Sequence, residues 1–234
     1  MMRRVVCCVA GFSVVFAAAI GGSAGIAQAA PAPPPSGSIT CGFASAATVS
    51  PGLLGTAYLP TKNGVPQNKA AKISTLGTAS ACNAAGVTGG KAPITGGSFM
   101  GSGKGTGRTC DAAANGGGST VLKTSIKWTG AGAVNVASTK ANLTIGALTF
   151  EDGAAIALPT SPADQIAYVT ANAGRFLKFT LTGTSTGKAF LNRNIAVTGV
   201  TDQTFLTFVT GCTATPIGLT GFSFSPAKSS VTVS

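Results

Sequence analysis

Short runs of alternating apolar and polar residues constrain this chain more than any other feature. The clearest run covers residues 120–128, where one face carries Leu122, Thr124, Ile126 and Trp128. The opposite face carries Val121, Lys123, Ser125 and Lys127. Successive strand residues point to opposite faces, so this alternation predicts a strand with one buried and one solvated face.

Similar short runs recur along the chain, separated by glycine, proline and asparagine. They cover residues 39–41, 73–82, 99–110, 142–148, 175–181, 194–197, 204–209, 218–224 and 229–233. Many short strands between turn residues predict an all-β antiparallel β-sandwich, with an irregular β-barrel as the alternative. At most one short helix is expected, at residues 165–169, because Ser161 before Pro162 is a typical helix start. A strand after a loop is the other interpretation of that run.

The run from Phe99 to Cys110 has an unusual glycine content. Its odd positions are mostly glycine, from Gly101 to Gly107, and its even positions are polar or basic. Glycine weakens a strand unless a bend or a closely approaching neighbour uses the missing side chain. We therefore expect another part of the chain to approach this glycine face.

Residues 1–29 have the organisation of a secretory signal peptide. A basic start precedes an apolar run of about 16 residues, and residues 27–29 are typical of a cleavage site. A membrane-spanning helix needs about 20 apolar residues, so a transmembrane anchor is disfavoured. We expect a mature chain from Ala30, with a flexible proline-rich lead over residues 30–38 and one domain over residues 39–234. The location predicted is extracellular or loosely associated with the cell wall.

Four cysteines remain after removal of this segment: Cys41, Cys82, Cys110 and Cys212. An even number in a secreted chain predicts two disulfides. We expect Cys82 to pair with Cys110, and Cys41 with Cys212. The alternative pairs Cys41 with Cys82 and Cys110 with Cys212. Since the chain has no histidine and no CxxC pair, neither a metal site nor a cofactor is expected.

Basic residues exceed acidic ones and are scattered singly in the sequence. Without Arg3 and Arg4, 14 basic residues face 5 acidic ones, a net charge of +9. Specific nucleic-acid binding is disfavoured, because it needs clustered cations and aromatic residues placed to stack on bases. Weak binding to anionic envelope polymers remains as the partner that this charge suggests.

No catalytic signature stands out. Residues 101–107 fail as a phosphate loop, since Gly105 rather than serine or threonine follows Lys104. The carboxylates have the sequence context of turns or caps; they are Asp111, Glu151, Asp152, Asp164 and Asp202. Without histidine, a serine nucleophile would need a lysine base, and no matching motif is present. Catalysis is therefore not expected, although a hydrolase built on carboxylates is an alternative.

The layout of these segments resembles that of small secreted actinobacterial proteins with four cysteines and no assigned activity. The matching parts are Thr40-Cys41, Ala81-Cys82, residues 101–110, residues 125–128, Gly211-Cys212 and the closing strand. Residues 142–174 depart from that layout. The resemblance implies a fold and a compartment, but no reaction. We therefore expect a secreted, non-catalytic protein at or near the cell surface, with a binding module for anionic or glycan polymers as the alternative.

Overall fold

The computed structural model describes residues 30–105, 107, 109–110, 120–159 and 161–234. Ala32–Ser234 form one compact unit, to which the following description refers. The predicted signal peptide lies outside the described residues, and so does Asp111.

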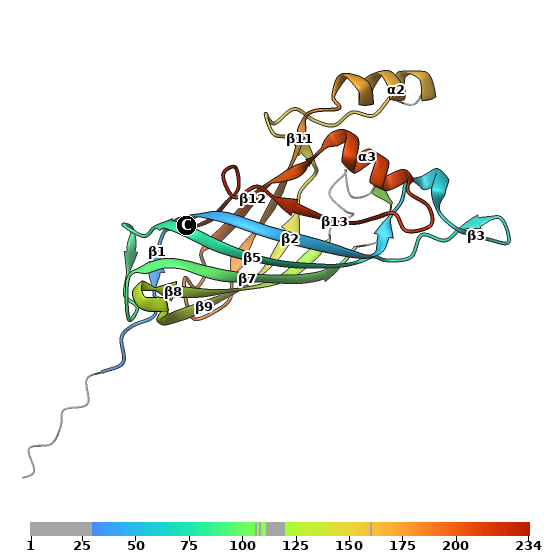
Figure 1. Cartoon of the computed structure of the whole chain (residues 1–234). Coiled ribbons are helices and arrows are strands. Elements are labelled where there is room, and N and C mark those ends of the chain that lie inside the picture. Colours follow the sequence, from blue (N-terminus) through green and yellow to red (C-terminus); the bar gives the residue numbers. More distant parts are fainter. Residues whose placement is uncertain (1–29, 106, 108, 111–119, 160) are drawn as a thin grey trace, which may run out of the picture. The chain divides into compact units, whose positions relative to one another are not determined.

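Ten strands form one large antiparallel sheet that closes on itself (Figure 1). Its strands are β2 (Ile39–Leu53), β5 (Lys72–Asn83), β7 (Ile94–Lys104), β8 (Val121–Gly130), β9 (Asn135–Ile145), β10 (Thr149–Phe150), β11 (Phe176–Ser185), β12 (Asn194–Thr204), β13 (Leu219–Phe224) and β14 (Ser230–Val233). The hydrogen-bonded neighbours run from β2 through β5, β7, β8, β9 and β11 to β12. The short strands β13 and β14 each pair with both β12 and β2, which completes the circuit.

Because the sheet closes on itself, the fold combines features of the β-sandwich and of the β-barrel that were expected from the sequence. The all-β antiparallel prediction is confirmed, with strands facing one another across a shared apolar core as in a sandwich. Hydrogen bonds from β11 to β12 and from β2 to β14 also join what would be the open edges of a sandwich. The closed pairing is the barrel-like feature of the fold, and it removes most exposed strand edges.

The inner face carries the alternating residues that the sequence indicated. On β8, Leu122, Ile126 and Trp128 are buried, while Lys123 and Lys127 are exposed. On β11 the inward residues are Leu177, Phe179 and Leu181. The alternation therefore identified the correct face of both strands.

Glycines on β7 allow neighbouring groups to approach closely, as expected. A Cβ atom at Gly101 would lie 2.7 Å from Cγ2 of Thr75, and one at Gly103 would lie 2.4 Å from the backbone oxygen of Val121. Both distances are too short for real side chains. The glycine face thus points inward, against the strands on either side of β7.

The described residues include two α-helices, α2 and α3, where at most one was expected. Helix α2 (Pro162–Ala171) begins as predicted, with Ser161 Oγ accepting a hydrogen bond from the Asp164 amide at 3.4 Å. Residues 204–209 were predicted to be a strand, and this is wrong. They lie largely in α3 (Phe205–Thr213), because Phe205, Phe208 and Cys212 fall on one helical face and are buried together.

The predicted disulfide pairing is also wrong. The bonds are Cys41–Cys82 and Cys110–Cys212. Cys41 on β2 lies beside Cys82 on the neighbouring β5, with 4.0 Å between their Cα atoms. Because β5 and β7 are antiparallel, the end of β5 that holds Cys82 is at the opposite end of the sheet from the region after β7 that holds Cys110.

The proline-rich lead makes hydrogen bonds with the domain. Strand β1 (Ser36–Gly37) pairs with β6 (Val87–Thr88). The carbonyl oxygens of Pro33 and Pro35 accept hydrogen bonds from the amides of Gly90 and Phe190. Flexibility of residues 30–38 stays a prediction.

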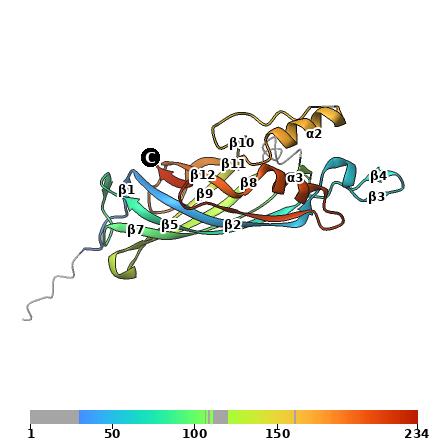
Figure 2. The same ribbon diagram turned by 45° about the horizontal axis from the view of Figure 1, so that its top comes forward.

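A short hairpin and two 3-10 turns are the remaining elements of the described residues. Strands β3 (Thr61–Lys62) and β4 (Val65–Pro66) form a small hairpin. The 3-10 turns η1 (Thr56–Tyr58) and η2 (Ala131–Ala133) follow β2 and β8. Turned views show α2, α3 and the β3–β4 hairpin gathered near one end of the closed sheet (Figures 1 and 2).

Candidate functional site

One end of the closed sheet, which we call the α3 end, contains cavities. Here β2, β7 and β9 end, β5 and β8 begin, and α3 lies beside their termini. Two cavities occur at this end, and α3 contributes to the wall of both.

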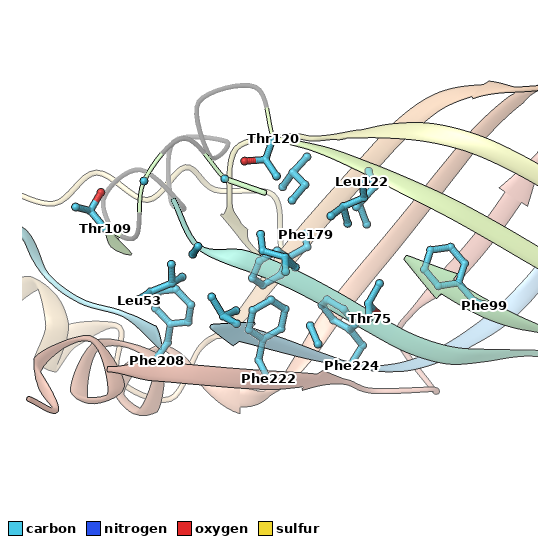
Figure 3. Close-up of a pocket in the computed structure, with 18 of the residues that line it drawn as sticks. Leu53, Thr75, Phe99, Thr109, Thr120, Leu122, Phe179, Phe208, Phe222 and Phe224 are labelled. Carbon is cyan, nitrogen blue, oxygen red and sulfur yellow. The ribbon is translucent and has the colours of Figure 1, made fainter. Parts of the chain in front are cut away.

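The first cavity, which we call the lumen cavity, lies inside the closed sheet and has a volume of about 70 Å³. Its lining comes from β2, β5, β7, β8, β9, β11, β13 and α3, and includes Ala47, Leu53, Phe99, Leu122, Phe179, Phe208, Phe222 and Phe224 (Figure 3). None of the described residues that line it is titratable. The lumen cavity is therefore suited to uncharged, apolar groups.

Phenylalanine rings form much of its wall. Phe179 stacks on Phe222 with 4.6 Å between ring centroids, and both rings meet Phe224 edge-on at 5.4 Å. Phe43 joins this cluster through Phe224, with 6.4 Å between ring centroids, and makes an edge contact with Phe99 at 5.1 Å. Ring pairs of this kind hold one another in place, so the wall is well defined before anything binds.

Two glycines leave space in the wall of the lumen cavity just beyond the end of β7. Gly105 and Gly107 line the lumen cavity without side chains, next to Thr109 and Thr120. Figure 3 shows Thr109 and Thr120 at one end of the cavity and Phe99 at the other. Thr109 and Thr120 thus add hydroxyl-bearing side chains at one end of a cavity whose wall is otherwise mainly aromatic and aliphatic.

The second cavity, which we call the outer groove, is also lined in part by α3 and has a volume of about 330 Å³. It is lined by η1, the segment before α2, and both helices; its members include Tyr58, Leu148, Ile156, Leu158, Gln165, Val169, Phe205, Phe208 and Val209. The Cys110–Cys212 disulfide also lines it. Most of these side chains are apolar, with Tyr58 and Gln165 among the few polar ones.

Phe208 is the wall shared by both cavities. Its side chain lines both the lumen cavity and the outer groove. Helix α3 is held by the Cys110–Cys212 bond, and the Gly55 amide donates a hydrogen bond to the Cys212 carbonyl at 2.8 Å. Phe208 is therefore a side chain on a fixed helix that is in contact with both spaces.

The adjacent carboxylates Glu151 and Asp152 occupy the turn after β10, as the sequence indicated. Glu151 pairs with Lys228 at 3.0 Å, and Asp152 pairs with Arg175. A hydrogen bond from the Ala154 amide, together with the charge of Arg175, lowers the pKa of Asp152. A general acid needs the opposite shift, so this turn has the features of a surface ion-pair site.

The other sequence candidates are not brought together. Asp164 lies in the first turn of α2, and Asp202 lies on β12. Ser102 and Lys104 both belong to the exposed face of β7. Among the residues that the structure describes, no group of three or more His, Cys, Asp or Glu side chains could hold a metal ion.

The lysines that are far apart in sequence gather in the structure. Five of them are exposed on four neighbouring strands: Lys72 on β5, Lys104 on β7, Lys123 and Lys127 on β8, and Lys140 on β9. The sequence did not reveal that these lysines are neighbours, because the pairing register of the strands brings them together and their order in the chain does not.

Reasoning from sequence missed both cavities. Phe205 and Phe208 were assigned to a strand, although their spacing also fits one face of a helix. Within the described part of the chain, no helix is both long enough and apolar enough to cross a bilayer. Comparison with protein-family models, curated proteins and solved structures finds no match to this chain.

Proposed function

We propose that this is a secreted, non-catalytic binding protein that holds a small, uncharged, mainly apolar molecule at the α3 end. The ligand occupies the outer groove, and Phe208 controls whether it also reaches the lumen cavity. The observation that carries the proposal is the position of Phe208 between two apolar cavities.

The sizes of the two cavities support this arrangement. The outer groove, at about 330 Å³, is within the usual range for small-molecule sites, roughly 300–1,000 Å³. The lumen cavity, at about 70 Å³, is smaller than the engineered apolar cavities of about 150 Å³ that bind benzene. The groove therefore holds the body of the ligand, and the lumen cavity admits only a slender end.

The chemistry of the lining supports binding rather than catalysis. The described lining of the lumen cavity has no titratable side chain, and the carboxylates of Glu151 and Asp152 line neither cavity and are paired with Lys228 and Arg175. Two disulfides are compatible with secretion, which oxidises cysteine pairs. A secreted protein that sequesters an apolar molecule needs a shaped cavity and no reactive group.

A fluorescence titration with N-phenyl-1-naphthylamine, an uncharged probe that brightens in apolar sites, tests the proposal. Val209 lines the outer groove, whereas Leu206 on the same helix is exposed. Val209→Phe fills the groove and is expected to weaken probe binding at least tenfold, or about 1.4 kcal/mol. Leu206→Phe adds a ring to the solvent side of the helix and is expected to bind as the wild type does.

Thermal unfolding of both variants shows whether α3 remains folded. If the wild-type protein does not bind the probe, or if Val209→Phe binds it as well as Leu206→Phe, the proposed site is wrong.

A further inference from the structure

The outer side of the closed sheet carries a second surface, which we call the lysine face: Lys72, Lys104, Lys123, Lys127 and Lys140. These side chains are exposed on β5, β7, β8 and β9, whose other face points into the core. Neighbouring strands are about 4.8 Å apart, so the lysine face lies on one continuous surface.

The register places these charges close together. Lys72 lies directly opposite Lys104 on the paired strands β5 and β7. Ser102 lies opposite Lys123, so Lys104 and Lys123 are diagonal neighbours. Ser125 lies opposite Lys140, which makes Lys123 and Lys140 diagonal neighbours in turn. The lysines thus form a diagonal band across four strands.

Such a band is unfavourable for folding. Like charges directly opposite each other destabilise a sheet. Strands β2, β5, β7, β8 and β9 contain no aspartate or glutamate. The described acidic side chains lie on other elements, where Glu151 pairs with Lys228 and Asp152 with Arg175. The repulsion is consistent with an anionic partner that the described residues do not supply.

Large apolar side chains lie within the same surface. Leu76 on β5 is 66% exposed, and Met100, directly opposite it on β7, is 40% exposed. Val121 on β8 is also exposed. Isolated apolar residues on a surface need no explanation. Leu76 and Met100, however, form an exposed cross-strand pair. Ser125 and Lys140 continue the same row of directly opposite residues across β8 and β9.

We propose that the lysine face, together with Leu76 and Met100, docks on an anionic lipid surface. Lysines beside an anionic membrane are attracted to its headgroups, and apolar side chains between them enter the boundary between headgroups and acyl chains. An anionic polysaccharide would be attracted to the lysines but would have no apolar region for Leu76 and Met100 to contact. The apolar pair therefore favours lipid over polymer.

This surface is separate from the proposed ligand site. The lysine face is on the outside of the sheet, whereas the outer groove and lumen cavity are lined by other residues at the α3 end. A variant that loses vesicle binding should therefore still bind the fluorescent probe, and a variant that loses probe binding should still bind vesicles.

Vesicle co-sedimentation of the purified protein tests the proposal, with phosphatidylcholine vesicles and with vesicles that also contain phosphatidylglycerol. We expect binding only to the anionic vesicles, and release by salt. Each lysine near such a surface contributes about 1 kcal/mol, so the double variant Lys104→Gln, Lys123→Gln should bind about 20- to 30-fold more weakly.

A second double variant isolates the apolar pair. Leu76→Thr, Met100→Thr keeps all lysines and uses a residue that favours strands. It should bind anionic vesicles at least fivefold more weakly than the wild type. The matched control is Lys62→Gln, Lys91→Gln, which removes the same charge from exposed positions outside the lysine face. The control should lose less than twofold, and thermal unfolding checks that every variant is folded.

Three results would overturn the proposal. One is equal binding to neutral and anionic vesicles. Another is equal weakening by the control and by Lys104→Gln, Lys123→Gln, which would reflect net charge alone. The last is unchanged vesicle binding by Leu76→Thr, Met100→Thr; together with binding to a soluble anionic polysaccharide, it would identify a polymer-binding surface instead.

Discussion

Trp128 shows how a single buried polar atom specifies this core. Its side chain is fully buried, and its ring meets Phe190 edge-on with 5.7 Å between centroids. The indole Nε1 donates a hydrogen bond to Oγ1 of Thr139 at 2.7 Å, and Thr139 donates to the Ala189 carbonyl at 3.3 Å. This chain of hydrogen bonds satisfies the indole in an otherwise apolar environment.

Replacing Thr139 tests that chain. Thr139→Val keeps the side-chain shape but leaves the buried indole N–H of Trp128 without its acceptor, which should lower the free energy of unfolding by about 1–3 kcal/mol. Thr182→Val makes the same change at an exposed position on β11 and should alter stability by less than about 0.5 kcal/mol. Denaturant unfolding measures both. Equal losses would mean that the indole hydrogen bond contributes little.

Helix α3 shows how the surroundings of an element override its composition. Phe205, Val209 and several threonines favour a strand, and the sequence was interpreted that way. In the structure Thr204 caps the helix by accepting a hydrogen bond from the Thr207 amide at 3.4 Å. Burial of Phe205, Phe208 and Cys212 on one side then outweighs the local preference.

Phe208→Ala should join the two cavities at the α3 end. The loss of a mostly buried ring should destabilise the protein by about 3–5 kcal/mol, so ligand measurements belong well below the unfolding temperature. Competition of linear alcohols with the fluorescent probe should then show a preference for longer chains than in the wild type. Adding Ala47→Val, which narrows the lumen cavity, should reverse that shift. An unchanged length preference in Phe208→Ala would show that Phe208 does not separate the two spaces.

At the scale of the whole molecule, closure of the sheet and the two disulfides act at different places. Cys41–Cys82 joins neighbouring strands at the end remote from α3, and Cys110–Cys212 joins the region after β7 to α3. Their sequence separations of 41 and 102 residues correspond to roughly 4–5 kcal/mol each in the chain-entropy model. One bond therefore reinforces a strand pair, while the other fixes the helix beside the cavities.

Peptide mapping under non-reducing conditions checks this connectivity. The secreted protein should give one linked peptide pair with Cys41 and Cys82, and another with Cys110 and Cys212. Thiol counting after denaturation should detect none. A Cys82–Cys110 peptide would contradict the strand order of the sheet, and detection of Cys7 or Cys8 thiols would contradict removal of residues 1–29.

Several elements could be predicted because their signal is local. The faces of β8 and β11 followed from alternation, and the start of α2 followed from Ser161 and Pro162. The candidate site could not be predicted in this way. Phe208, Phe222 and Ala47 come from α3, β13 and β2, and they line one cavity only because the sheet closes.

The sequence by itself determined the antiparallel β class, the inward face of the main strands and the inward glycine face of β7, since each depends on residues a few positions apart. Only the tertiary structure decided the disulfide pairing, the helical state of residues 205–213 and the gathering of Lys72, Lys104, Lys123 and Lys140 on one surface. These features depend on which strands pair and in which register. That choice is made by burial of the shared core across the whole chain, and no short stretch of sequence contains it.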